Sequence, residues 1–230
     1  KTAEPLTLLW LRKNWARNRS HRPDCLASVR KLTSPTLVVC STCFLKITVV
    51  MSLLRNALGV QQIPPNIALY GLSLILTAYI MAPIGARIQQ EVVKQPGAMR
   101  SVESLVQVAR AGAEPLREFM LRHSKAEQRG FFMDHTKKLW GPELSADVQP
   151  TDFAVLMPAF LVSEITAAFQ IGFLLFLPFI VIDLVISNIL LAMGMMMVSP
   201  VTISLPLKLF LFVAVDGWSR LIHSLVLTYV

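Results

Sequence analysis

Charged side chains are scarce in this chain. They make up 16% of its 230 residues, whereas hydrophobic residues make up 54% and the mean hydropathy is +0.56. Soluble domains carry about 25% charged residues. This shortage excludes an ordinary soluble domain, because the apolar surface must be covered by lipid or by a large assembly. We therefore expect a membrane-associated protein.

Cysteine and histidine are also rare, with three and four residues. Cys40 and Cys43 have the CxxC spacing, but there is no second CxxC and the histidines are not clustered as metal ligands. This pattern excludes a disulfide framework and a zinc site, so we expect the thiols to pack as apolar side chains. We expect no metal and no cofactor.

Motifs of catalysis are missing as well. The chain has no Walker A loop, no GxSxG, no HExxH and no GxGxxG after a strand. Its basic N-terminal stretch lacks the regular spacing and the interleaved recognition residues of a nucleic-acid-binding segment. We therefore predict a protein that is not an enzyme and that binds no nucleic acid.

Long apolar runs, in contrast, are present. Residues 171–198 form a nearly unbroken run of 28 residues, interrupted by Asp183 and the weakly polar Ser187 and Asn188. A hydrocarbon core of ~30 Å needs roughly 20 helical residues, so this run exceeds one simple span. The carboxylate near its middle must be compensated.

The charges are spread unevenly along the chain. Residues 1–35 hold eight basic and two acidic residues, whereas residues 87–152 hold ten and nine. A nearly neutral hydrophilic loop can be translocated, while Lys/Arg-rich flanks stay cytoplasmic. These shifts predict four regions: an atypical basic N-terminal segment (1–43), a first apolar hairpin (44–86), a hydrophilic periplasmic helical domain (87–152), and a second apolar helical region with a Met-rich loop (153–230).

Proline, glycine and charge mark the expected breaks in the first half. The apolar blocks 36–58 and 67–86 are separated by a Gly/Pro turn, which predicts a helical hairpin that ends at Arg87. The hydrophilic region has helical stretches at 101–110 and 114–129. Apolar residues in the second stretch recur at three- and four-residue spacing, as on one face of an amphipathic helix.

The second half has its own predicted breaks. Pro178 is expected to kink or break a helix, so 154–177 and 179–198 would form the arms of a bent or hairpin element. A final helix is expected at about 204–228. The fold class is thus all-α, with membrane-associated helical hairpins and a small helical hydrophilic insertion.

Five charged residues lie within the apolar stretches: Lys46, Glu164, Asp183, Lys208 and Asp216. An unpaired charge there costs at least ~2.5–3.5 kcal/mol, so these residues should pair or face water. They are candidates for a proton or ion relay, or for contacts between helices or subunits that neutralise one another. The absence of an accompanying histidine and of an Asp/Glu series at helical spacing favours contacts.

Four of the ten methionines fall within five residues, at Met193, Met195, Met196 and Met197, next to Gly194. Unbranched thioether side chains adapt to irregular contacts, so such a cluster is able to seal an opening around varied partners. Ordinary helix packing in a membrane protein is the alternative.

Three segments resemble the SctR/FliP family, the export-apparatus proteins of type III secretion systems and flagella. They are FLKITVVMSLLRNALGVQQIPPN (44–66), MPAFLVSEITAAFQIGFLLFLPFIVIDLVISNILLAMGMMMVSP (157–200) and TISLPLKLFLFVAVDGW (202–218). The resemblance covers about 44–230. The QQIPPN turn and ILLAMGMMMVSP look more like the injectisome branch than the flagellar one.

This resemblance implies more than the residues alone. Family members form a ring of several copies, taken here as a pentamer, with SctS- and SctT-like subunits and SctU- and SctV-like components in the bacterial inner membrane. Their nominal transmembrane helices are largely lifted into this helical assembly, through which unfolded effector and needle proteins are secreted. The Met-rich loop is the channel gasket, which maps onto Met193, Met195, Met196 and Met197. The charged residues become inter-helix or inter-subunit contacts.

The N-terminal stretch departs from the family pattern. Family members begin with a long apolar helix, whereas residues 1–35 are basic, and family-like sequence resumes abruptly at Phe44. A fragment, a divergent start and a frame-shifted reading are the alternatives, and the abrupt change favours a frame error upstream of about Thr42. The leading hypothesis is a core subunit of the type III secretion export gate; the alternatives are a proton-coupled membrane transporter that uses Glu164 and Asp183, and a non-functional frame-shifted remnant.

Overall fold

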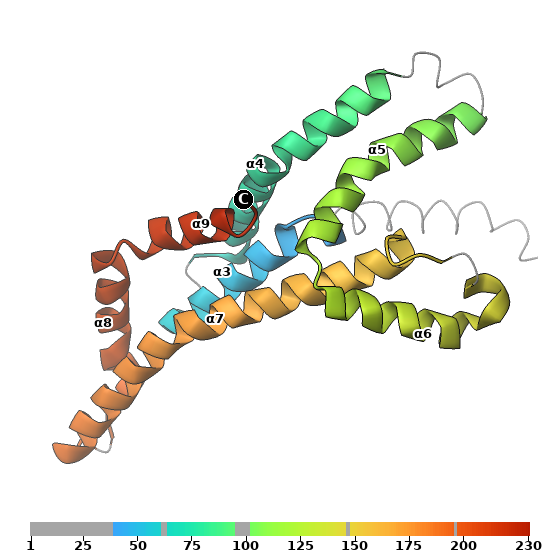
Figure 1. The fold of residues 1–230 in the computed structure, drawn as a ribbon. Helices are drawn as coiled ribbons and strands as arrows, with labels where there is room; N and C mark the ends of the chain where they lie inside the picture. Colours follow the sequence, from blue (N-terminus) through green and yellow to red (C-terminus); the bar gives the residue numbers. More distant parts are fainter. Residues whose placement is uncertain (1–38, 61–63, 95–101, 146–147, 196) are drawn as a thin grey trace, which may run out of the picture. The chain divides into compact units, whose positions relative to one another are not determined.

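The described part of the chain is helical. The computed structural model describes residues 39–60, 64–94, 102–145, 148–195 and 197–230, and no strand occurs among them (Figure 1). All but Val39 belong to one unit, Cys40–Val230. The predicted all-α class is confirmed, whereas most of the basic segment 1–43 lies outside the described residues.

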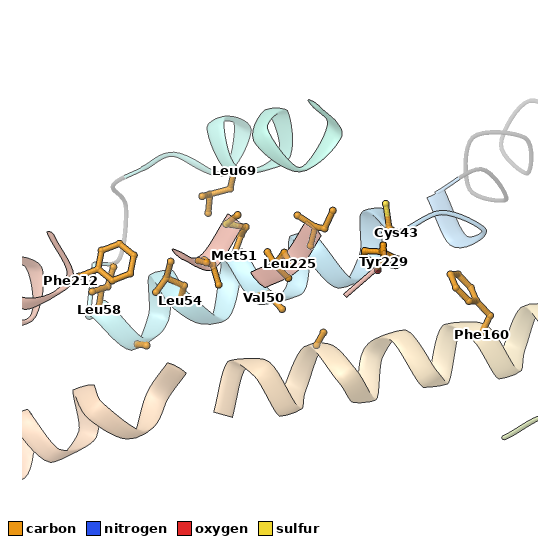
Figure 2. Close-up of a cluster of buried hydrophobic side chains, with 14 of the residues drawn as sticks. Cys43, Val50, Met51, Leu54, Leu58, Leu69, Phe160, Phe212, Leu225 and Tyr229 are labelled. Carbon is orange, nitrogen blue, oxygen red and sulfur yellow. The ribbon is translucent and has the colours of Figure 1, made fainter. Parts of the chain in front are cut away.

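Helix α3, Phe44–Leu58, lies along α7, Phe153–Ala192, and carries much of the core (Figure 2). Its apolar side chains recur at three- and four-residue spacing, which places them on one face of the helix. The buried ones are Ile47, Val50, Met51, Leu54, Ala57 and Leu58. The helix ends at Gly59, whose φ of 77° is the left-handed conformation that glycine adopts without strain.

Helix α4, Asn66–Val93, packs against α3 after the predicted turn. The Arg55 guanidinium donates a hydrogen bond to Asn66 Oδ1 across this turn. The prediction that the helix ends at Arg87 is wrong, because the residues from Arg87 to Val93 contain neither proline nor glycine and continue the helix. A single charged residue therefore does not end a helix.

The hydrophilic region holds α5, Val102–His123, and α6, Ala126–Ser145. The predicted boundaries at 101–110 and 114–129 are wrong, because α5 continues through Pro115 and ends at His123. The Lys125 backbone N–H donates to Ser163 Oγ on α7 at 3.0 Å, which fixes the break between the two helices. The predicted apolar face of α5 is confirmed, since Phe119 and Met120 are buried.

Helix α7 is one continuous helix of 40 residues. Of the predicted bent or hairpin element with arms at 154–177 and 179–198, the hairpin is therefore wrong. Pro178 removes one donor, the bond to the Leu174 carbonyl, and membrane helices tolerate such a loss when neighbouring groups compensate. At a rise of 1.5 Å per residue, α7 is about 60 Å long.

The C-terminal region consists of α8, Pro200–Ala214, and α9, Gly217–Leu227, bent by 62° with respect to each other. The predicted single helix at 204–228 is wrong because Asp216 adopts a left-handed conformation with φ 53°. Asp followed by Gly is a common turn dipeptide, so the sequence did carry this signal.

Two described helices are long and apolar enough to cross a membrane, over Asn66–Glu91 and Phe153–Ala192. The bent pair α8 and α9 makes a third if it counts as one span. Many large apolar side chains on these helices are exposed within the single chain. The chain is therefore a membrane protein whose apolar surface is covered by groups outside it.

Candidate functional site: two ion pairs and a Met-rich loop

The first ion pair joins α3 to α7. Lys46 Nζ lies 3.4 Å from Glu164 Oε1, and the two side chains are 6% and 3% exposed. Removing two charges from water costs several kcal/mol per ion, which their attraction offsets only when the remaining polar atoms also find partners. The surroundings of the pair must therefore supply further contacts.

Tyr229 supplies these contacts. Its hydroxyl donates a hydrogen bond to Glu164 Oε2, and Lys46 Nζ lies 4.2 Å from the centre of its ring, a cation–π distance. The Phe119 ring stacks against the Tyr229 ring with a centroid separation of 6.0 Å. Tyr229 thus ties the segment after α9 to α3, α5 and α7. Sequence reasoning missed this residue, because no local spacing marks it.

Two titratable groups next to the pair are neutral at pH 7. Burial, aided by the charges of Lys46 and Arg122, lowers the pKa of His123 to about 4. Burial raises the pKa of the Cys43 thiol to about 11. Cys43 is fully buried and is therefore a protonated, apolar thiol, as the sequence predicts.

The second ion pair joins α7 to α8. Lys208 Nζ lies 2.6 Å from Asp183 Oδ2 and also donates to the Ala57 carbonyl oxygen of α3 at 3.4 Å. The Lys208 side chain is 6% exposed, but that of Asp183 is 40% exposed. This pair is therefore enclosed on the lysine side and open on the carboxylate side.

The structure thus brings four of the five predicted charges together in two pairs and leaves Asp216 apart. Asp216 lies at the exposed break between α8 and α9, where its Oδ1 accepts a hydrogen bond from Ser219 Oγ at 3.0 Å. Its expected position inside an apolar helix is wrong, because the helix breaks at this residue.

The Met-rich loop begins where α7 ends. The Gly194 N–H donates to the Leu191 carbonyl and the Met195 N–H to the Leu190 carbonyl, both at 3.0 Å. These two bonds form a Schellman motif, which requires the left-handed conformation that Gly194 adopts with φ 74°. The loop therefore starts from a fixed helix end.

The methionine side chains that the structure describes in this loop are exposed. Met193, Met195 and Met197 are all exposed, the last of them completely, while Met196 lies outside the described residues. The loop ends at Ser199, and Pro200 opens α8 as its first residue. The described thioethers are thus available to groups outside the chain.

Metal-binding clusters were not expected. In the ranges that the structure describes, no group of three or more His, Cys, Asp or Glu side chains is arranged to hold a metal ion. The described residues instead form ion pairs between the helices of the chain and leave apolar side chains exposed on its surface.

The chain is similar to known proteins over most of its length. The family model described as the FliP family matches residues 29–225, so the family-like sequence begins upstream of Phe44 and earlier than predicted. The chain is 54% identical over 195 residues to "Yop proteins translocation protein R" of Yersinia pestis, covering 85% of this chain and 90% of that protein. "Probable translocation protein y4yL" of Sinorhizobium fredii is 52% identical over 192 residues (84% and 86%). "Virulence protein YscR" of Salmonella typhimurium is 45% identical over 197 residues (85% and 90%).

Proposed function

Because the chain belongs to the FliP family, it is a core subunit of a type III secretion export gate, and we propose that its copies form the channel wall as a pentameric ring. SctS- and SctT-like subunits complete the gate, and SctU- and SctV-like components adjoin it. The assembly lies in the bacterial inner membrane, with residues 87–152 on the periplasmic side. Unfolded effector and needle proteins pass through it.

The length of α7 is the observation that carries this proposal. A hydrocarbon core of ~30 Å covers a helix of about 60 Å only at a tilt of roughly 60°, whereas membrane helices tilt by 0–40°. Apolar side chains are exposed from Val162 to Leu191, which is about 44 Å of the helix and more than a ~30 Å core covers at a 40° tilt. Part of α7 must therefore be covered by protein, as the wall of a multi-subunit assembly is.

The methionines suit the narrowest point of such a channel. A ring of copies repeats Met193, Met195, Met196 and Met197 around one axis, and flexible thioethers can close around chains of different sequence. A stiff, well-packed ring would select one shape. We therefore assign the loop as the gasket of the export channel.

The geometry disfavours the proton-coupled transporter. Glu164 is held on both oxygens, by Lys46 and by Tyr229, and its side chain is 3% exposed. A relay group must exchange protons with water or with a neighbouring carrier during each cycle. The pair instead has the contacts of a structural cross-link between α3 and α7.

Native mass spectrometry tests the proposal. The chain is expressed with its SctS- and SctT-like partner subunits and extracted in mild detergent, and the mass of the complex gives the number of copies. Five copies with partner subunits are expected. A chain that remains monomeric, while a flagellar relative expressed in the same way enters a complex, would overturn the proposal.

A further inference from the structure

An apolar groove of about 560 Å³ lies between α7, α8 and α9. Its lining includes Leu174 and Pro178 of α7 and Phe212 of α8, and α9 contributes Arg220 and Ser224 along one edge. On α9 the lining positions run from Gly217 to Thr228, which is about three helical turns. The groove is therefore long enough to hold the side chains of one helix face.

The same helix α7 also presents an exposed apolar stripe. We use "α7 stripe" for the side chains that follow one another at three- and four-residue spacing and are all exposed: Phe169, Phe173, Leu177, Ile180 and Leu184. Each of these side chains is 42–62% exposed in the described part of the chain. This spacing is the pattern with which a helix anchors itself in an apolar groove.

The groove and the α7 stripe lie on nearly opposite faces of α7. At 100° per residue, the mean direction of the α7 positions that line the groove is roughly 170° from that of the stripe. A chain cannot fold its own stripe into its own groove across a single straight helix. A second copy can supply the stripe, and its own groove then remains free for a third.

Charge complementarity points to the same occupant. Arg220 is exposed at the groove and forms no ion pair with any described residue. Asp183 lies about 60° around the helix from Ile180, at one side of the α7 stripe, and its side chain is 40% exposed. Docking of the stripe brings this half-open carboxylate toward the unpaired guanidinium of another copy.

We propose that the groove of one copy receives the α7 stripe of the next copy, with Asp183 of the incoming helix facing Arg220. The contact is heterologous, so it repeats in one direction and closes into a ring when the rotation per copy allows it. This inference rests on the proposed assembly of several copies and adds to it the two faces that meet.

Disulfide cross-linking between two differently tagged chains tests this contact. Both chains lack the native cysteines; one carries Ser224→Cys in the groove, and the other carries Phe173→Cys, Leu177→Cys or Leu184→Cys in the stripe. Both are expressed with the SctS- and SctT-like subunits and oxidised, and a linked pair with both tags is expected on a non-reducing gel. Because the cysteines are on different chains, no cross-link arises within one copy.

Val185→Cys is the matched control. Val185 is exposed and adjacent to Leu184, but it lies about 100° around the helix, away from the stripe. Its cross-link to Ser224→Cys should be several-fold weaker than the best one from the stripe. In a stripe pair, Arg220→Glu should lower the cross-linked fraction several-fold, while Arg220→Lys should largely retain it.

Native masses separate the failure of this inference from the failure of the proposed function. A multi-copy complex without any stripe cross-link, or with equal cross-linking from Val185→Cys, overturns the contact and leaves the gate assignment standing. Phospholipid retained in the groove of that complex would identify the other occupant. If no multi-copy complex forms at all, both proposals fail.

Discussion

The two ion pairs of α7 lie in its two halves, one toward each end, and differ in how far the chain encloses them. At the Glu164 end, both side chains are at most 6% exposed, and Tyr229 completes the contacts. At the Asp183 end, the lysine is buried but the carboxylate is 40% exposed. The surroundings of Glu164 are thus supplied by the chain itself. The exposed side of Asp183 is left for a neighbouring molecule to cover. The first pair should therefore govern folding and the second should govern assembly.

The largest effect is expected from Glu164→Ala. This change leaves Lys46 buried without its carboxylate, which should lower the free energy of unfolding by about 3–5 kcal/mol. Unfolding in a mixed-detergent titration measures it. The double variant Lys46→Met/Glu164→Gln removes both charges and should recover most of the loss. A single variant that unfolds like the parent would show that this end is not enclosed in solution.

Gly172→Ala tests the contact between α3 and α7 that lies between the two pairs. An added Cβ would lie 2.2 Å from Leu53 Cδ1, so the two helices or the leucine must shift, at about 1–3 kcal/mol. The same detergent titration reports the change. Gly71→Ala on α4 is the control, because a Cβ there has no atom within 4 Å. Equal effects of both changes would mean that α3 and α7 are loosely packed.

Asp183→Asn should cost the isolated chain about 1–3 kcal/mol, less than Glu164→Ala, because the buried Lys208 loses a charged partner but the asparagine amide oxygen can still accept its hydrogen bond. Lys208 keeps its bond to the Ala57 carbonyl. The same change should weaken assembly more than it weakens folding, as judged by the fraction of chain in the multi-copy complex. A loss of stability as large as that of Glu164→Ala would remove the distinction between the two ends.

The effect that depends on pH concerns His123 at the enclosed end. Its pKa is about 4 in the folded chain and about 6.5 when unfolded, so the unfolded state takes up the proton first. The stability that neutral His123 provides is complete above pH 6.5 and is lost as the pH falls toward 4. Unfolding titrations at pH 7.5 and 5 should show a smaller pH dependence for His123→Gln than for the parent. Identical pH dependence would place His123 in water.

Composition and apolar spacing predicted the elements better than they predicted the helix ends. The turn after Gly59 and the apolar face with Phe119 were recognisable, because local spacing and glycine determine them. Apolar spacing does not predict the break at Asp216, because apolar residues continue on both sides of it, although the Asp-Gly dipeptide marks a turn there. At Pro178 the error was the opposite, since one missing donor does not break a long apolar helix.

The sequence predicted which charged residues need a partner, but not which of them pair with each other. Lys46 and Glu164 are 118 positions apart, and their meeting depends on how α3 and α7 align along each other. No local pattern contains that alignment. Tyr229 was missed for the same reason, since its role exists only where three helices meet. A charged residue in an apolar stretch therefore predicts that an oppositely charged partner exists, but it does not predict which residue that partner is.

The anchored ends of the Met-rich loop limit how far a gasket made from it is able to move. Between the Schellman end at Gly194 and Pro200 lie residues 195–199, whose fully extended span is at most about 18 Å. So short a tether cannot swing aside as a lid does. The bore of a channel closed by this loop would be set by the tilt of α7 and α8, and the tightness of its seal by the rotation of methionine side chains.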